Sequence, residues 1–384
     1  MKILRLISSV DPKYGGPIEG VNQLSAVHDS MGIEVEICSL DSPNAACVQN
    51  SKIKVHALGP GITKYAYSTC LIPWLKKHAK EYDAVIVQGL WQYVGFAAWR
   101  ALAGTAIPYF VFTHGMLDPW FKHTYPLKHL KKWLYWPWAE YRVLRDASKV
   151  IFTCEEERLL ARKSFWLYKV NEAVTSYGVG NPPEDKTGLK AKFLGRYPNL
   201  QGKRIVLFLS RIHEKKGCDL LIEAFAKISQ NDEAIHLVMA GPDQTGWAFK
   251  LKVLAESLGV AHRITWTGML QDEMKWGAYY AAEVFCLPSH QENFGIVVAE
   301  ALACGKPVLI SNKVNIWREI EADGAGFVAD DTLAGTINNF ERWLEMQPDE
   351  SQKMIAQTTR CFMKYFHVQH AAQQLIEIIK GNIK

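Results

Sequence analysis

The sequence predicts an α/β protein with two parallel-sheet domains. Short apolar runs typical of buried strands alternate with segments of helical periodicity in both halves of the chain, which is the pattern of parallel sheets covered by helices. The length of 384 residues favours two domains over one. Several strands end in polar or glycine-containing loops that lead into helices, and ligands bind at that edge of such sheets.

The composition excludes several classes of protein. Hydrophobic residues make up 48% and charged residues 22% of the chain, as in a folded soluble protein. The net charge of +5 does not by itself predict nucleic-acid binding. The eight cysteines have neither Cys-x-x-Cys nor zinc spacing, which indicates buried thiols in a reducing compartment. Residues 1–9 are too short and too charged for a signal peptide, and the longest uncharged runs are interrupted, so we expect a cytoplasmic protein.

The first predicted domain covers residues 1–182. Its strands are expected at residues 1–9, 34–40, 52–58, 84–88, 108–113, 149–154 and 174–179. Its helices are expected at 19–31, which Gly32 ends, at 67–80, whose last turn is basic, and after the acidic residues 155–157. The segment 180–185, with its glycine and prolines, is predicted to be a linker.

Three residues after these strands are candidates for a binding site. Gly15 and Gly16 stand between the first strand and the first helix, where a ligand can approach the bare backbone; an ordinary turn is the alternative. His114 follows the strand at 108–113 at the edge where sites form, with Gly115 beside it. A purely structural histidine is the alternative at that position.

The segment 120–145 mixes basic and aromatic residues. They are Lys122, Lys128, Lys131, Lys132, Arg142 and Arg145 among Trp120, Tyr125, Trp133, Tyr135, Trp136, Trp138 and Tyr141. Such a mixture binds carbohydrate, a membrane surface or nucleic acid. The alternative is a helix that packs its aromatic rings on the sheet and solvates its lysines. No RNA or DNA motif accompanies the segment, so no nucleic-acid partner is expected.

The second predicted domain covers residues 200–364. Its strands are expected at 204–209, 236–240, 263–270, 282–287 and 307–311, with helices at 220–229, 247–258 and 297–304 and one or two amphipathic helices within 350–380. Arg211 and Lys216 share the loop after the first of these strands. Guanidinium offers a planar fork to phosphate oxygens and ammonium a point charge. A solvated basic turn is the alternative.

Two carboxylates flank the start of the helix at 297–304. Glu292 lies in the loop after the strand at 282–287, and Glu300 lies eight positions later, near the first turn of the helix. Helix starts present free backbone N–H groups that attract phosphate, so one carboxylate can reach sugar hydroxyls and the other ribose hydroxyls. A core helix with two solvated glutamates is the alternative.

The context of these carboxylates carries a family resemblance. The Glu-x7-Glu pattern, with Asn293, Phe294, Gly295 and Ile296 inside it and Pro288 before it, resembles the donor-site signature of retaining glycosyltransferases of family four, the glycosyl transferases group 1, of the type that makes exopolysaccharide or cell-envelope polysaccharide. The resemblance covers most of the chain. It implies the GT-B fold, in which two Rossmann-like domains face each other across a cleft and the last helix, about 365–384, crosses back to the first domain.

The resemblance also implies roles for the candidates. The expected catalytic residues are His114, Glu292, Arg211 and Lys216. Arg211 and Lys216 hold the donor diphosphate, and Glu300 holds the ribose. Glu292 and the backbone of 293–296 hold the donor sugar, which His114, Gly15 and Gly16 approach from the first domain. Gly268 and Met269 lie in the loop that holds the base. Ser210 stands where the family usually has a glycine, and we expect little harm from that departure.

The expected function is transfer of a hexose, with retention, from a nucleotide-sugar, UDP-glucose first, to a saccharide or lipid-linked saccharide acceptor in polysaccharide biosynthesis. No Asp-x-Asp occurs in the sequence, so no metal or other cofactor is expected. The leaving phosphate accepts the acceptor's proton; a transient covalent bond to Glu292 is the alternative. Residues 120–145 are expected to contact the inner face of the membrane. A sugar-nucleotide epimerase of the same fold and a non-catalytic nucleotide-sugar binding protein are the rival functions.

Overall fold

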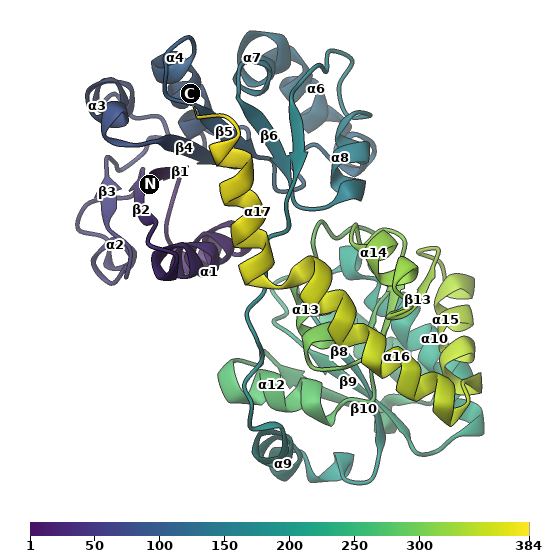
Figure 1. The fold of residues 1–384 in the computed structure, drawn as a ribbon. Coiled ribbons are helices and arrows are strands. Elements are labelled where there is room, and N and C mark those ends of the chain that lie inside the picture. Colours follow the sequence, from purple (N-terminus) through teal and green to yellow (C-terminus); the bar gives the residue numbers. More distant parts are fainter. Residues whose placement is uncertain (384) are drawn as a thin grey trace. The chain divides into compact units, whose positions relative to one another are not determined.

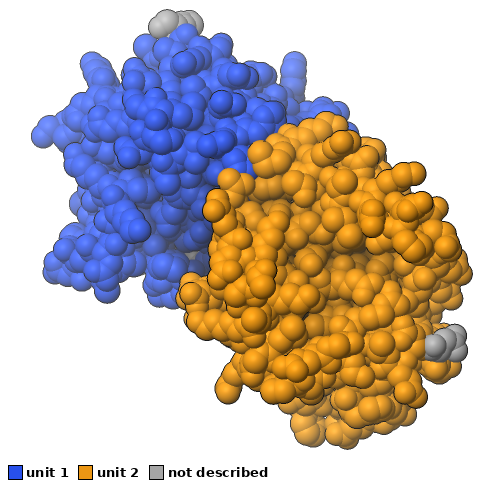
Figure 2. All heavy atoms as spheres, turned by 60° about the horizontal axis from the view of Figure 1, so that its bottom comes forward, with its two compact units in different colours: residues 1–180, 367–384 blue, residues 181–366 orange. Residues whose placement is uncertain are grey.

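The chain divides into two compact units. The computed structural model describes residues 1–383. The first unit contains Met1–Gly180 and the chain from His367 onward, and the second is Asn181–Phe366 (Figure 2). The sequence analysis ended the first domain at residue 182, began the second at residue 200 and returned the chain to the first domain at about residue 365.

The first unit is built on a seven-stranded parallel sheet in the order β3-β2-β1-β4-β5-β6-β7 (Figure 1). The strands are β1 (Lys2–Ile7), β2 (Glu34–Ser39), β3 (Val55–Ala57), β4 (Ala84–Gln88), β5 (Tyr109–Phe112), β6 (Lys149–Phe152) and β7 (Glu172–Val174). The helices are α1 (Gly16–Ser30), α2 (Ala46–Gln49), α3 (Leu71–His78), α4 (Tyr93–Leu102), α5 (Trp120–Thr124), α6 (Pro126–Tyr135), α7 (Tyr141–Arg145), α8 (Glu155–Ala161) and α17 (Val368–Lys380). The strand order reverses between β1 and β4, so their carboxyl ends form the switch point where open sheets bind ligands.

Both faces of this sheet are buried. On one face Leu4 and Leu6 of β1 pack with apolar residues of α3 and α4. On the other face Ile3 and Ile86 pack with residues of α17, which are Val368, Ala371, Ala372, Leu375, Ile376 and Ile379. The last helix of the chain therefore completes the core of the first unit.

The second unit is built on a six-stranded parallel sheet in the order β10-β9-β8-β11-β12-β13. The strands are β8 (Arg204–Leu209), β9 (Ile235–Ala240), β10 (Ile264–Gly268), β11 (Val284–Leu287), β12 (Val308–Ser311) and β13 (Gly326–Ala329). The helices are α9 (Lys186–Arg196), α10 (Cys218–Ile228), α11 (Trp247–Ser257), α12 (Asp272–Ala281), α13 (Ile296–Ala303), α14 (Trp317–Ala322), α15 (Leu333–Glu345) and α16 (Pro348–Cys361). The order reverses between β8 and β11, so the loops after these two strands share a switch point.

The structure corrects several predicted elements. The strand predicted at 174–179 is wrong, because β7 ends at Val174 and the residues after it pack against α17: the Val368 N–H donates to the Val179 carbonyl at 3.0 Å. The segment 120–145 is not one helix. It is divided into α5, α6, a π-helical turn at Trp136–Glu140 and α7, with Pro126 at the first break and Pro137 in the turn, since proline removes a helical donor. Strand β13 was not anticipated.

Two further expectations are settled by the structure. All eight cysteines are free thiols, and six are buried, but Cys70 is exposed and Cys47 is only partly buried. Within residues 1–383 no helix is both long and apolar enough to cross a membrane.

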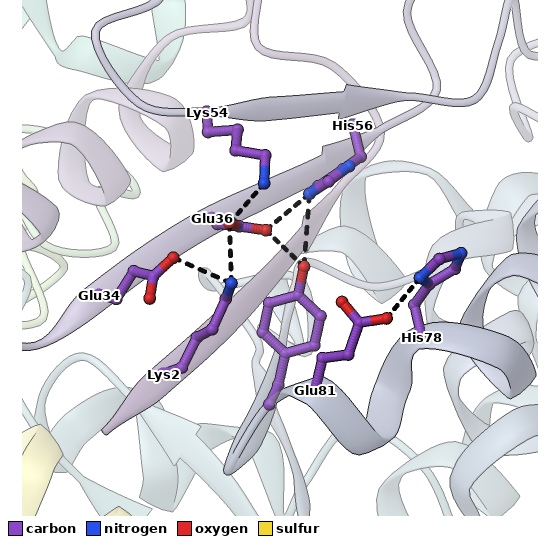
Figure 3. Close-up of polar contacts among 8 residues, drawn as sticks. Lys2, Glu34, Glu36, Lys54, His56, His78 and Glu81 are labelled. Carbon is purple, nitrogen blue, oxygen red and sulfur yellow. Dashed lines mark hydrogen bonds and ion pairs between the residues drawn. The ribbon is translucent and has the colours of Figure 1, made fainter.

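A buried carboxylate ties the amino ends of the first sheet together (Figure 3). Glu36 on β2 is 2% exposed. Its oxygens accept from Lys2 at 3.0 Å, Lys54 at 2.8 Å, His56 at 2.6 Å and Tyr82 at 2.5 Å. Burial alone would raise the pKa of the Glu36 carboxyl, but these donors outweigh burial and leave the pKa well below its ordinary value. This cluster lies away from the carboxyl edge, so we interpret it as structural.

Replacing this carboxylate is expected to destabilise the fold in a pH-dependent way. Glu36→Gln should lower the free energy of unfolding by about 1–3 kcal/mol at pH 7, because it leaves buried donors without a charged partner. Since the folded pKa is depressed, the stabilisation is complete above the ordinary pKa of 4.5 and is lost as the pH falls below it. The difference between wild type and variant should therefore shrink from pH 7 to pH 3 in urea unfolding. Glu34→Gln is the control: Glu34 is exposed and forms an ion pair with Lys2, so its replacement should change stability by less than about 0.5 kcal/mol.

Candidate active site

The loop after β8 carries the two predicted cations. Arg211 is exposed, two residues after the strand. A short 3-10 turn, Glu214–Lys216, then brings Lys216 into the interior, where the residue is 5% exposed. Gly217 ends that turn in the left-handed conformation, with φ of 63°, and begins α10. A β-carbon there would lie 2.1 Å from the carbonyl oxygen of Pro288 in the loop after β11, so the two loops touch at this glycine.

The loop after β11 carries Glu292. Its backbone is pinned on both sides: the Glu292 N–H donates to the Lys313 carbonyl at 2.9 Å, and the Asn315 N–H donates to the Glu292 carbonyl at 3.0 Å. Gly295 then adopts φ of 68° and begins α13, and no side chain caps that helix start within the described chain. The first N–H groups of α13 are therefore available to an anion.

The structure joins two residues that the sequence analysis assigned to different parts of the donor. The ammonium of Lys216 forms an ion pair with the Glu292 carboxylate across the two loops. Burial raises the pKa of the Glu292 carboxyl, but the charge and hydrogen bond of Lys216 outweigh burial. The pKa is therefore below its ordinary value, and the carboxylate is ionised at neutral pH. An ammonium has three donors, and the remaining ones can bind phosphate oxygens while the pair persists.

Glu300 also has bonding partners. It is not one of the solvated glutamates that the alternative interpretation of this helix expected. It is the fifth residue of α13, one position further along the helix than expected, and is 7% exposed. Its carboxylate accepts from Lys275 at 2.7 Å and from the Tyr279 hydroxyl at 3.0 Å, both on α12. The sequence analysis missed Lys275 and Tyr279, although their spacing of four residues places them on one helix face and could have indicated them.

The predicted base loop is open. Gly268 is the last residue of β10, the edge strand of the sheet, and has φ of 69°. Met269 is 61% exposed. At this position a base could contact the backbone of Gly268 and the exposed apolar side chain of Met269.

In the first unit the glycine pair lies at the start of α1. Gly15 has φ of 80° and precedes the helix, whose start no side chain caps within residues 1–383. A β-carbon at Gly15 or Gly16 would meet no atom within 4 Å. The backbone conformation favours glycine at position 15 only, and the space around both residues is free for an approaching group.

His114 is held in a strained position after β5. Its φ of 51° is rare for a residue with a side chain. One ring nitrogen bonds the Gln88 side-chain oxygen at 2.9 Å, the other bonds the Tyr177 hydroxyl, and the ring stacks between Phe112 and Tyr177. Burial and then the charge of Arg5 lower the pKa of His114 to about 3, so the imidazole is neutral. The sequence analysis missed Gln88 and Tyr177; a polar residue ending the apolar strand β4 was the available signal for Gln88.

Known proteins resemble this chain in sequence and in fold. The profile of the family "Glycosyl transferases group 1" matches residues 192–360, and that of the "Glycosyl transferase 4-like domain" matches residues 15–178. D-inositol 3-phosphate glycosyltransferase of Rhodococcus opacus is 30% identical over 51% of this chain and 44% of its own length. Mannosylfructose-phosphate synthase of Agrobacterium fabrum is 28% identical over 46% of this chain and 40% of its own length. The chain thus matches less than half the length of these curated relatives.

Two solved structures share the fold over nearly the whole chain. Sucrose-phosphate synthase of Thermosynechococcus elongatus has a TM-score of 0.75 at 20% identity, covering 99% of this chain and 98% of that one. HepE of Anabaena, solved with UDP and glucose, has a TM-score of 0.77 at 18% identity, covering 99% of this chain and 100% of that one. At these identities the likeness shows the fold alone.

Proposed function

Because the chain belongs to the glycosyl transferases group 1 and has the GT-B fold of two parallel-sheet Rossmann-like domains, we propose that it transfers a hexose from a nucleotide-sugar to an acceptor hydroxyl with retention of configuration. The observation that carries this proposal is the cluster at the switch point of the second sheet. There a buried lysine, an ionised carboxylate and an uncapped helix start come from the loops after two neighbouring strands.

Each part of this cluster suits one part of a nucleotide-sugar. Lys216 and the exposed guanidinium of Arg211 bind the diphosphate, together with the N–H groups that begin α13. Glu292 binds hydroxyls of the donor sugar, helped by the backbone of 293–296. Glu300, already held by Lys275 and Tyr279, accepts from the ribose hydroxyls. Gly268 and Met269 lie against the base. In the first unit Gly15, Gly16 and His114 remain the candidates for sugar binding.

The proposed reaction stabilises charge on the leaving group. The bond between the anomeric carbon and the diphosphate breaks, and the acceptor oxygen forms its bond on the same face. The acceptor's proton passes to the leaving phosphate oxygen, so atoms and charges balance. Negative charge grows on the diphosphate as its bond breaks, and the preorganised cations Arg211 and Lys216 stabilise that charge. In glycosyltransferases with an Asp-x-Asp motif a divalent ion neutralises the diphosphate. We propose that Arg211 and Lys216 do so here and that the reaction needs no metal.

The identities of donor and acceptor are the finer part of the proposal. UDP-glucose is the first candidate donor, and the structures of HepE with UDP and with UDP-glucose support it. The acceptor is a saccharide or lipid-linked saccharide used in polysaccharide synthesis. Exposed apolar residues on and near α6, namely Leu127, Leu130, Trp133, Leu134, Trp138 and Trp166, with Lys128 and Lys131 beside them, support contact with an anionic membrane surface.

A single assay tests these statements together. The protein is incubated with UDP-glucose and candidate acceptors, free or carried in phosphatidylglycerol vesicles, and free UDP, the glycosidic product and sedimentation with the vesicles are measured. We expect UDP release that depends on acceptor, an α-linked product and undiminished rates in EDTA. A changed sugar without any acceptor would identify an epimerase, and tight donor binding without UDP release would identify a binding protein. Activity lost to EDTA and restored by Mg²⁺ or Mn²⁺ would exclude a metal-independent reaction.

A further inference from the structure

A small pocket lies in the first unit, and the residues that line it begin with Met116, two positions after His114. Its volume is about 210 Å³, and its walls include Met116, Asp118, Phe121, Tyr125, Lys132 and Phe165. These residues come from the loop after β5, from α5 and α6, and from the chain that follows α8. Met116 connects the pocket to the histidine: its sulfur accepts from the Leu90 N–H at 3.1 Å, and both Met116 and His114 lie near the bare α-carbon of Gly89.

Lys132 is the unusual residue in this pocket. Its ammonium lies 4.5 Å from the centre of the Trp91 ring and 5.5 Å from the centre of the Phe121 ring. Within residues 1–383 it has no hydrogen bond and no ion pair. Burial lowers the pKa of this ammonium, although the neighbouring Glu140 opposes that effect. Glu140 is itself buried, and burial raises the pKa of its carboxyl to about 7, so it neutralises Lys132 only in part at neutral pH.

A cation in this position favours an anion in the pocket. Aromatic faces attract an ammonium by about 0.5–2 kcal/mol, which offsets only part of the cost of removing it from water. An anionic group bound inside the pocket would supply a counter-charge in direct contact with Lys132, which Glu140 does not. Lys128, exposed at the pocket wall and 4.6 Å from the centre of the Tyr125 ring, adds a second ammonium.

The volume and the lining residues of the pocket limit the kind of ligand that can bear the anionic group. Pockets for drug-sized ligands hold about 300–1,000 Å³, so a pocket of about 210 Å³ suits one sugar ring and excludes a nucleotide. The rings of Phe121, Tyr125 and Phe165 offer flat apolar surface to the face of a sugar ring. The carboxylate of Asp118 already accepts from the Trp120 N–H at 2.8 Å, and a carboxylate has several lone pairs, so it can also accept from a sugar hydroxyl.

We propose that this pocket binds the acceptor, and that the acceptor's terminal sugar carries an anionic group, a phosphate or a carboxylate, which pairs with Lys132. The inference rests on the proposed function, because only a transferase needs an acceptor site. It narrows the acceptor class from saccharides in general to anionic saccharides.

Direct binding to the whole protein tests the proposal without donor. The probes are glucose 1-phosphate, glucuronic acid and neutral glucose, measured by titration calorimetry. We expect one or both anionic probes to bind and neutral glucose to bind at least tenfold more weakly. Lys132→Met keeps the side-chain length and removes the charge, and it should weaken the anionic probe at least tenfold. Lys77→Met is the matched control, since Lys77 is an exposed lysine on α3, and Lys132→Arg should retain most of the binding.

Two readouts separate this proposal from the function on which it rests. Thermal shift by UDP should be the same in Lys132→Met and wild type, which also shows that the variant folds. In turnover, Lys132→Met should raise the acceptor KM and leave the donor KM unchanged. Neutral acceptors used as well as anionic ones, or anionic probes bound equally by Lys132→Met, would overturn the pocket proposal and leave the transferase intact. If the anionic probes bind through Lys132 but no sugar is transferred, the transferase function is overturned and the anion-binding pocket remains.

Discussion

Lys216→Ala is expected to reduce turnover at least about a hundredfold, the usual loss when one preorganised charge contact to a developing negative charge is removed. Lys216 is the buried cation of the switch point and sits 5% exposed between the loops after β8 and β11. Its removal takes away a cation that we propose to stabilise the leaving diphosphate. It also leaves the carboxylate of Glu292 without its ion pair. Steady-state kinetics with saturating donor and acceptor measures the effect.

The two consequences of this substitution can be separated. Glu292→Gln in the same chain leaves no buried charge without a partner, so it isolates the loss of stability. It is not expected to restore turnover, because Glu292 is itself proposed to bind the donor sugar. We expect the double variant to recover stability and to remain at least a hundredfold slow. Lys227→Ala, an exposed lysine on α10, serves as the control and should be fully active. Near wild-type turnover in Lys216→Ala would remove this residue from the mechanism.

Gly217→Ala should strongly destabilise the second unit, because the new side chain meets both a strained backbone conformation and a collision. The residue has φ of 63°, which costs a side-chain-bearing residue about 1–2 kcal/mol. The added β-carbon would lie 2.1 Å from the Pro288 carbonyl oxygen, which is backbone and cannot rotate away. Overpacking of this kind costs about 1–3 kcal/mol. We therefore expect a loss of roughly 2–5 kcal/mol and a fall in the unfolding temperature of roughly 5–15 °C.

A second glycine separates strain from collision. Gly259 has φ of 72°, and a β-carbon there would meet no atom within 4 Å. Gly259→Ala should therefore show the conformational cost alone, about 1–2 kcal/mol, with normal turnover. Gly217→Ala should also lose turnover, because the collision pushes apart the loops that carry Lys216 and Glu292. Equal unfolding temperatures for the two variants would show that the loops accommodate the methyl group.

Most of the fold was predictable because its signals are local. Strands β4 and β8 are found at the predicted residues, since uninterrupted apolar runs bounded by polar residues leave one interpretation. The prediction failed where tertiary contacts replace sheet pairing. Residues 175–179 look like a strand, but they are covered by α17, which lies almost two hundred positions later in the chain. No pattern within a short window carries that information.

The candidate site was predictable as a set of residues and not as a set of contacts. Arg211, Lys216, Glu292 and Glu300 were assigned from their loops, and the structure places the loops after β8 and β11 on neighbouring strands. The sequence analysis assigned Arg211 and Lys216 to the diphosphate, Glu292 to the donor sugar and Glu300 to the ribose. The structure pairs Lys216 with Glu292, Glu300 with Lys275, and His114 with Tyr177.

The amino-acid sequence alone determined the two sheets, the loops that carry charge and the family to which they point. These follow from the periodicity of apolar residues and from glycine and proline, whose effects act over a few residues. Only the tertiary structure decided which charges neutralise one another and which do not, such as Lys132 between two aromatic rings. The energy of a charge depends on the atoms that replace water around it, and those atoms come from elements distant in the chain.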